Sequence, residues 1–212
     1  LTSATNVYNV AVGFDAGLSV TTGTNNTLIG GLAGDAITTG AGNVAVGFEA
    51  LSTEDAGGQN VAIGYQAMKA ADIGGNGNAV VIGYQAGLAL TTGTQNVLIG
   101  AIAGTDLTEG GSNVALGYAA LDAETKGSRS VAIGRLALNA QNFTTAIDSH
   151  NTAVGFDSGK SVTTGRQNTF IGSLAGDATD DGNDNVAIGH QALSANAGDD
   201  NVAIGKDALL VN

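Results

Sequence analysis

The sequence predicts an all-β protein, a parallel β-solenoid or β-roll of about 12 coils of about 17 residues each. Three observations lead to this fold class. A nine-residue motif recurs along the chain, each copy contains the alternating pattern of a short strand, and the composition is rich in glycine but poor in aromatic residues. Because so few bulky side chains are available, we expect a thin core between closely spaced stretches of backbone, and therefore a rigid, narrow rod.

The repeated motif reads Asn-x-x-(branched aliphatic)-Gly-x-x-Ala-(Gly/Leu), and residues 60–68 are a typical copy. Its glycine, here called the motif glycine, recurs at intervals of 17 residues in most copies, and we number coils 1 to 12 by it: Gly13, Gly30, Gly47, Gly64, Gly83, Gly100, Gly117, Gly134, Gly155, Gly172, Gly189 and Gly205. The residue four places later is Gly in two successive copies and then Leu or Met in the next two. The chain is therefore three copies of a four-coil block.

We expect one continuous solenoid domain with two insertions. Its parts are a lead-in at 1–8, a first block at 9–75, a second block at 76–138, an inserted loop at 139–150 and a third block at 151–212. A two-residue insertion lies around 74–77, and the loop at 139–150 adds four residues to its coil. Insertions in solenoids belong on the outside of the coil, where we expect any specialised contact.

Each motif copy predicts one short strand. In residues 60–64, branched side chains alternate with a small one, which is the period of a strand and not of a helix. The branched residue before each motif glycine forms an apolar column: Val12, Ile29, Val46, Ile63, Ile82, Ile99, Leu116, Ile133, Val154, Ile171, Ile188 and Ile204. We expect this column to face the interior, with the residue before it on the opposite face.

The motif glycine marks the bend that ends each strand, where a positive φ or a close approach of backbone excludes a Cβ atom. The alanine three residues later, replaced only by Ser158, indicates a crowded inside corner. A unit of 17 residues is too short for a strand, helix and strand crossover. Coils are therefore expected to stack about 4.8 Å apart, in a rod roughly 55–60 Å long.

Asparagine opens ten of the twelve motif copies, with Ala79 and Ser130 as the replacements. Stacked side-chain amides both donate and accept hydrogen bonds, so they predict a ladder that also satisfies turn backbone groups. The ladder residues are Asn9, Asn26, Asn43, Asn60, Asn96, Asn113, Asn151, Asn168, Asn185 and Asn201.

The second coil of each block differs from the others. Six of the twelve coils have an aromatic residue after the motif glycine, whereas the second coil has a small one and places its bulk at Leu28, Leu32, Leu98, Ile102, Phe170 and Leu174. We expect these six residues on the outer face of the rod. Repeated exposed apolar patches indicate an interface, here between chains along the rod. A stripe of aromatic residues that stacks on carbohydrate is the alternative.

Composition excludes several classes of function. The net charge of −12, from 7 Lys and Arg against 19 Asp and Glu, disfavours binding to nucleic acid and to anionic membranes. No apolar run reaches the roughly 18–20 residues of a membrane-spanning helix, so we expect no membrane insertion. The chain contains no cysteine and only two histidines, His150 and His190, which leaves no zinc site.

No pattern typical of catalysis is present either. Gly159-Lys160-Ser161 lacks the upstream glycine of a phosphate-binding loop, and the carboxylates Asp15 and Glu49 are replaced by Gln66 and Gln85 in the same column. We therefore expect a protein that is not an enzyme and has no cofactor or metal. Calcium in the acidic turns 177–184 and 199–200 is a weaker alternative, because their spacing matches no known calcium loop.

The repeats resemble the Asn-Thr-x-(Ile/Leu)-Gly-x-x-Ala-Gly/Leu units of bacteriophage tail-fibre proteins, and they are similar to the shorter (Ser/Asn)-x-Ala-Ile-Gly-x-x-Ala repeats of trimeric autotransporter adhesin heads. The resemblance covers the chain from Asn9 to Leu209. It implies a homotrimeric, left-handed parallel β-roll in an extracellular or virion setting, with an adhesive or spacer role. The 17-residue unit is longer than the typical adhesin-head repeat, which favours the phage fibre.

We therefore expect a structural shaft segment of a fibre, with a spacer role and a role in attachment to a cell-surface glycan or protein receptor. The alternatives are a self-polymerising extracellular filament subunit and a bacterial adhesin head. A glycan-depolymerising spike and an ice-binding solenoid are less favoured, since Thr-Thr pairs occur only sporadically. An uncovered strand edge templates association, so we expect both ends to continue into further domains or into the next copy stacked end to end.

Overall fold

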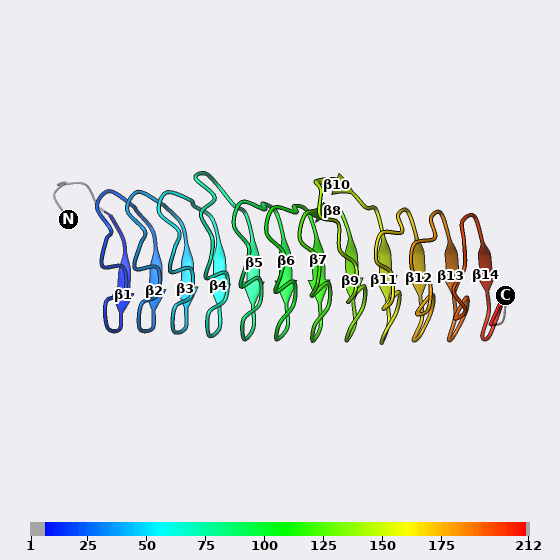
Figure 1. Ribbon diagram of the computed structural model, residues 1–212. Coiled ribbons are helices and arrows are strands. Elements are labelled where there is room, and N and C mark those ends of the chain that lie inside the picture. Colours follow the sequence, from blue (N-terminus) through cyan, green and yellow to red (C-terminus); the bar gives the residue numbers. More distant parts are fainter. Residues whose placement is uncertain (1–6, 211–212) are drawn as a thin grey trace.

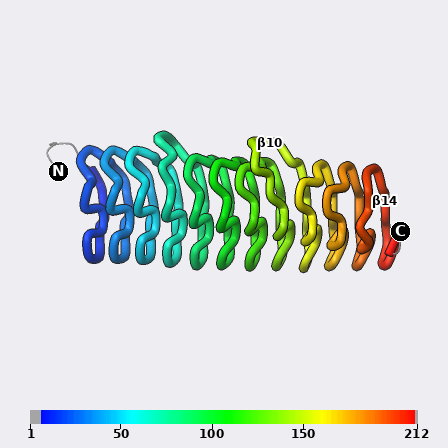
Figure 2. Tube along the Cα trace, in the orientation of Figure 1, coloured from blue at the N-terminus to red at the C-terminus, as the bar shows by residue number. Residues whose placement is uncertain are grey.

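The computed structural model describes residues 7–210, which form one long β-solenoid (Figure 1). Each coil contributes one three-residue strand, and twelve such strands make a single parallel sheet along the rod. Within residues 7–210 there is no helix. The predicted all-β parallel solenoid is confirmed. Figure 2 shows the coils stacked in sequence order, so that residues 7 and 210 lie at opposite ends of the rod. The lead-in predicted at 1–8 lies mostly outside the described residues.

The strands of the main sheet follow the motif copies in order. They are β1 (Val10–Val12), β2 (Thr27–Ile29), β3 (Val44–Val46), β4 (Val61–Ile63), β5 (Val80–Ile82), β6 (Val97–Ile99), β7 (Val114–Leu116), β9 (Val131–Ile133), β11 (Thr152–Val154), β12 (Thr169–Ile171), β13 (Val186–Ile188) and β14 (Val202–Ile204). Neighbouring strands pair position for position, as Val61 with Val80 and Ile63 with Ile82. Every column of the repeat is therefore a straight line of residues along the rod.

Two further strands lie outside the main sheet. β8 (Gly127–Ser128) and β10 (Ile147–Asp148) pair in parallel, and they project from one edge of the rod (Figure 1). The loop predicted at 139–150 thus contains a short strand. As expected, the insertion lies outside the coil, and β9 and β11 still pair in the regular register.

The central residue of each strand points inward, and the branched residues on either side of it point outward. Ala62 is fully buried between half-buried Val61 and Ile63, and nearly every strand repeats this order. The prediction that the column before the motif glycine faces the interior is therefore wrong. Alternation shows which residues share a face, but both faces here are apolar, so apolarity could not identify the inner one. The inner face is the one that fits small side chains.

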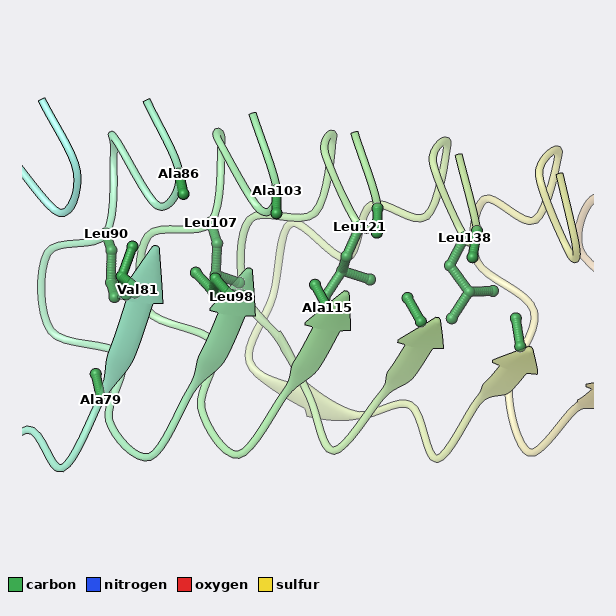
Figure 3. Close-up of a cluster of buried hydrophobic side chains, with 14 of the residues drawn as sticks. Ala79, Val81, Ala86, Leu90, Leu98, Ala103, Leu107, Ala115, Leu121 and Leu138 are labelled. Atoms are coloured by element: carbon green, nitrogen blue, oxygen red, sulfur yellow. The ribbon is translucent and has the colours of Figure 1, made fainter. Parts of the chain in front are cut away.

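The core is filled in two alternative ways, and this explains the four-coil period. Leu98 is fully buried, and Figure 3 shows it pointing from β6 into the solenoid. A Cβ atom added to Gly104 would lie 3.0 Å from Leu98 Cδ2, so glycine leaves the space that the leucine fills. In the next two coils the strand residue is alanine, and Leu121 and Leu138 fill the core from the position that Gly104 has in its own coil.

The prediction of an interface formed by the second coil of each block is therefore wrong for the three residues that lie in the core. Leu28, Leu98 and Phe170 are all 0% exposed and cannot contact a second chain. They are large because the glycines opposite them are small: a Cβ on Gly176 would lie 2.5 Å from Phe170 Cδ1. The other three members, Leu32, Ile102 and Leu174, are half-buried and follow the motif glycine by two residues, outside the main sheet.

The motif glycines are required both by their positive φ and by the close approach of backbone from the next coil. Gly64 has a φ of 138°, and a Cβ atom there would lie 2.2 Å from the carbonyl oxygen of Gly83 in the next coil. The alanine column is likewise a crowded corner, since Ala33, Ala50 and their equivalents in the interior coils are fully buried.

Candidate functional site: the outer face of the sheet

The outer face of the main sheet is a continuous, mostly apolar surface along the rod. It consists of the first and third residue of every main-sheet strand, and is here called the outer sheet face. Its first column is Val10, Thr27, Val44, Val61, Val80, Val97, Val114, Val131, Thr152, Thr169, Val186 and Val202, and its second is the Val12 to Ile204 column given above. None of these residues is charged, and only three are polar.

The outer sheet face has the dimensions of a protein interface. Twelve strands span about 53 Å. The outer sheet face together with the motif glycine and the residue after it covers five positions, about 13 Å, which gives roughly 700 Å² per chain. A stable interface buries about 800 Å² per partner. The largest apolar patch on an ordinary monomer is about 300–600 Å². An outer sheet face of this area is therefore suited to contact with another chain.

Aromatic side chains line one border of this face. They follow the motif glycine, and three in successive coils stack: the ring centroids of Phe48 and Tyr65 are 5.6 Å apart, and those of Tyr65 and Tyr84 are 5.4 Å apart. Three coils further on, the Arg135 guanidinium carbon lies 5.9 Å from the Tyr118 ring centroid and 5.2 Å from that of Phe156. Cation–π attraction allows this cation to sit within the aromatic border.

The stacking argues against carbohydrate binding by the aromatic stripe. The Phe48, Tyr65 and Tyr84 rings are nearly parallel, at 18° and 10°, so the faces between them are covered by each other. A sugar ring stacks on an open aromatic face, and Tyr65 has none left. The rings present edges instead, which suits packing against a second apolar surface.

A polar row lies beside the aromatic border. Gln66 Nε2 donates to Glu49 Oε2 at 2.8 Å, and Gln85 Nε2 donates to Gln66 Oε1 at 2.9 Å. The hydrogen bond from Lys69, followed by that from Gln66, holds the pKa of Glu49 below its usual value. Glu49 is thus paired with a cation and an amide. It does not form a general acid and base pair with Asp15.

Two carboxyls elsewhere on the rod have a raised pKa, and burial is the main cause for both. Asp35 is further affected by the negative charges of Glu49 and Asp15, and Asp122 by that of Asp106. Asp35 lies in coil 2 and Asp122 in coil 7, so the two affected carboxyls are in separate parts of the rod.

The remaining candidate residues are separate from one another. His150 and His190 are exposed in different coils, and Lys160 Nζ pairs with Asp157 Oδ2 at 3.3 Å. The acidic turns 177–184 and 199–200 meet where Asn183 N–H donates to Asp199 Oδ1 at 2.7 Å, but within residues 7–210 no group of three His, Asp or Glu side chains could hold a metal ion. A cavity of about 310 Å³ opens at coil 1, and Leu28 and Val20 are among the residues that line it. These residues belong to core columns, which in the interior coils are covered by the neighbouring coil.

The asparagine column links every pair of adjacent coils that both contain it. Asn43 N–H donates to Asn26 Oδ1 at 2.9 Å, and Asn43 Nδ2 donates to the Gly57 carbonyl at 2.8 Å. The column is therefore mainly a ladder of amide to backbone bonds, and it serves the turns. It is interrupted near the first insertion, where buried Asn60 Nδ2 has no hydrogen-bond partner.

The sequence interpretation put both columns of the outer sheet face on one side of the strand, and placed that side inside. The signal for the face was present, because both flanking columns are branched in every copy. No protein-family model, curated protein or solved structure matches this chain. A search of the described residues for a helix long and apolar enough to cross a membrane finds none.

Proposed function

We propose that this chain is a structural shaft segment of an extracellular or virion fibre, in which three copies associate along their length through the outer sheet face. In this proposal the shaft is a spacer and contributes to attachment to a cell-surface glycan or protein receptor. The observation that supports it best is the outer sheet face itself, apolar over all twelve coils and bordered by stacked aromatic edges.

Association of copies accounts for features that a solitary rod leaves without a role. Burying roughly 700 Å² of mostly apolar surface at about 25 cal/mol per Å² is favourable by more than 10 kcal/mol before the entropy of association is subtracted. The rest of the rod is acidic, with a net charge of −12 per chain, so contact through any other side is opposed by repulsion. The straight columns also give each copy the same shape at every coil.

The function proposed needs no catalytic step. Two alternatives have no support in the geometry of the described residues. A depolymerising spike would need a free carboxylate pair, but Glu49 pairs with Lys69, and an ice-binding solenoid would need an array of threonines, but the outer sheet face is mostly aliphatic. Attachment to a receptor would use the edges of the rod, where the insertions project.

The oligomeric state of the purified chain tests the proposal. Light scattering at micromolar concentration is expected to give three times the chain mass of 20.7 kDa. Ile82→Asp places a charge in the middle of the outer sheet face and is expected to shift the mass to that of a single chain, because a buried unpaired charge costs several kcal/mol.

Thr92→Asp is the matched control, since Thr92 is exposed in a turn of the same coil. It is expected to leave the trimer intact. A compact monomer for the unmodified chain, or equal effects of the two variants, would sink the proposal.

A further inference from the structure

Two of the four glutamates of this chain are buried inside the solenoid. Glu54 and Glu124 are both 0% exposed. Each lies seven residues after its motif glycine, in a column that is otherwise uncharged between coils 1 and 10: Val20, Ile37, Ala71, Leu90, Leu107, Gln141, Val162 and Thr179. No lysine, arginine or histidine within residues 7–210 forms a salt bridge with either glutamate. A buried carboxylate without a cation requires several hydrogen bonds to be tolerated.

Backbone amides supply those bonds. Glu124 Oε1 accepts from the N–H groups of Thr125, Lys126 and Gly127 at 2.8, 3.1 and 2.7 Å. The same oxygen accepts from Phe143 N–H in the next coil at 3.0 Å, and Glu124 Oε2 accepts from Gln141 Nε2 at 2.8 Å.

Glu54 makes a reduced form of this arrangement one block earlier, with one turn amide and one amide of the next coil. Its Oε1 accepts from Gly57 N–H at 2.6 Å, and its Oε2 accepts from Ile73 N–H in the next coil at 3.1 Å. Ile73 and Phe143 hold equivalent positions, nine residues after their motif glycines. A Cβ atom on Gly57 or Gly127 would lie 2.5 Å from the carboxylate, so these glycines make room for it.

In regular coils a carbonyl oxygen of the next coil accepts the hydrogen bonds of these turn N–H groups. The N–H groups of Thr91, Thr92 and Gly93 all donate to the carbonyl oxygen of Thr108 in the next coil, at 3.0, 3.2 and 3.2 Å. Thr125, Lys126 and Gly127 occupy the same three positions in coil 7. All three donate to the Glu124 carboxylate, and Lys126 N–H also donates to the carbonyl oxygen of Phe143 in the following coil at 3.0 Å.

The glutamates occur only where the following coil is irregular. The coil after Glu54 contains the insertion of two residues, and the coil after Glu124 contains the insertion of four. No other coil between coils 2 and 11 is longer than 17 residues, and none of them follows a glutamate in this column. Across both insertions the main sheet keeps its register, with Val61 opposite Val80 and Val131 opposite Thr152.

We propose that Glu54 and Glu124 are insertion anchors. Each carboxylate accepts hydrogen bonds from turn N–H groups that in an ordinary coil go to a carbonyl oxygen of the next coil, and it also binds the first N–H of the diverging segment. The next coil can then leave the stack and project a loop from the edge of the rod. The outer sheet face remains continuous because the divergence is absorbed inside the turn. This role does not depend on the proposed function, since it concerns the fold of each chain.

A double-mutant cycle tests the anchor at coil 7. Glu124→Leu copies the regular column residue Leu107 and removes the acceptor. A second background replaces residues 143–150 by the four residues of 109–112, which restores a 17-residue coil. In the native background, Glu124→Leu is expected to lower the unfolding midpoint by about 4 °C or more. In the shortened background the shift is expected to fall to less than half of that value, because the next coil again supplies a carbonyl acceptor.

Hydrogen exchange measured by mass spectrometry locates the effect. With Glu124→Leu, peptides covering 125–127 and 143–149 are expected to lose protection, whereas those of β2 and β13 keep it. Glu109→Gln is the control, because Glu109 is a half-exposed glutamate of the preceding coil. Equal midpoint shifts in the two backgrounds, or loss of protection spread evenly along the rod, would overturn the proposal. If Glu124→Leu gives no folded protein, Glu124→Gln in both backgrounds makes the same comparison.

Discussion

At the scale of single residues, three columns of the repeat show how little each position is free to vary. The motif glycine combines a positive φ with a carbonyl oxygen where a Cβ atom would lie. The asparagine ties each coil to the next through its side-chain oxygen and nitrogen. The central strand residue occupies an interior that is one side chain wide. The Ile63 column is only half-buried on the outer sheet face, and the proposed association of copies would cover it.

Substitutions at adjacent residues of β4 separate the inner face from the outer one. Ala62→Asp puts a charge into the fully buried core, so it is expected to prevent folding at a cost of several kcal/mol. Ile63→Asp puts the same charge on the outer sheet face, and the chain is expected to keep its β-structure while losing association. Circular dichroism checks both variants. A folded Ala62→Asp protein together with an unfolded Ile63→Asp protein would show instead that Ile63 faces the interior and Ala62 faces outward.

At the scale of the coil, the second coil and the last two coils of each block fill the core in two different arrangements. In one, a large strand residue such as Leu98 faces glycine. In the other, a small strand residue such as Ala115 faces a leucine held at positive φ, as Leu121 is at 55°. In the first coil of each block the strand residue is small and the other position is glycine, and the large residue of the second coil fills the space: a Cβ atom on Gly159 would lie 2.8 Å from Phe170 Cδ2. Since close-packed cores tolerate neither voids nor excess volume, the two positions must be matched.

This matching predicts coupling between Leu98 and Gly104. Leu98→Ala alone is expected to cost about 2–5 kcal/mol, because it leaves a cavity. Gly104→Leu alone is expected to destabilise the protein as well, because the added side chain meets Leu98. The double variant copies the Ala115 and Leu121 arrangement of the next coil and is expected to cost clearly less than the sum of the single variants. Denaturant unfolding of the four proteins measures this, and strict additivity would contradict it.

The repeat spacing was sufficient to predict the coils, their number and the parallel register, because every motif copy presents its glycine and asparagine at the same offset. The inner face could not be predicted in the same way. Ile63 is more apolar than Ala62, and hydrophobicity alone places it inside, but the narrow interior selects size over apolarity. The buried Glu124 was missed because its partners are backbone amides, which have no sequence signature. The interface prediction failed at Phe170 for a related reason, since its filling of the core depends on glycines in two coils.

At the scale of the whole molecule, the sides of the rod differ in polarity, and the proposed association depends on this difference. One side is a straight apolar sheet about 53 Å long, and the other sides are turns with the polar ladders, the insertions and most of the negative charge. Insertions do not interrupt the sheet, because they leave the coil at an edge (Figure 1). Copies that associate through the sheet therefore keep their projecting loops accessible along the fibre.

The most direct test of this account is the distance between equivalent residues of associated chains. The chain has no cysteine, so Thr152→Cys, on the outer sheet face, and Thr164→Cys, in an exposed turn of the same coil, each allow one spin label per chain. Pulsed electron paramagnetic resonance is expected to give a short interchain distance for the label at 152 and a much longer one for the label at 164. No interchain coupling at 152, or the shorter distance at 164, would contradict association through the outer sheet face.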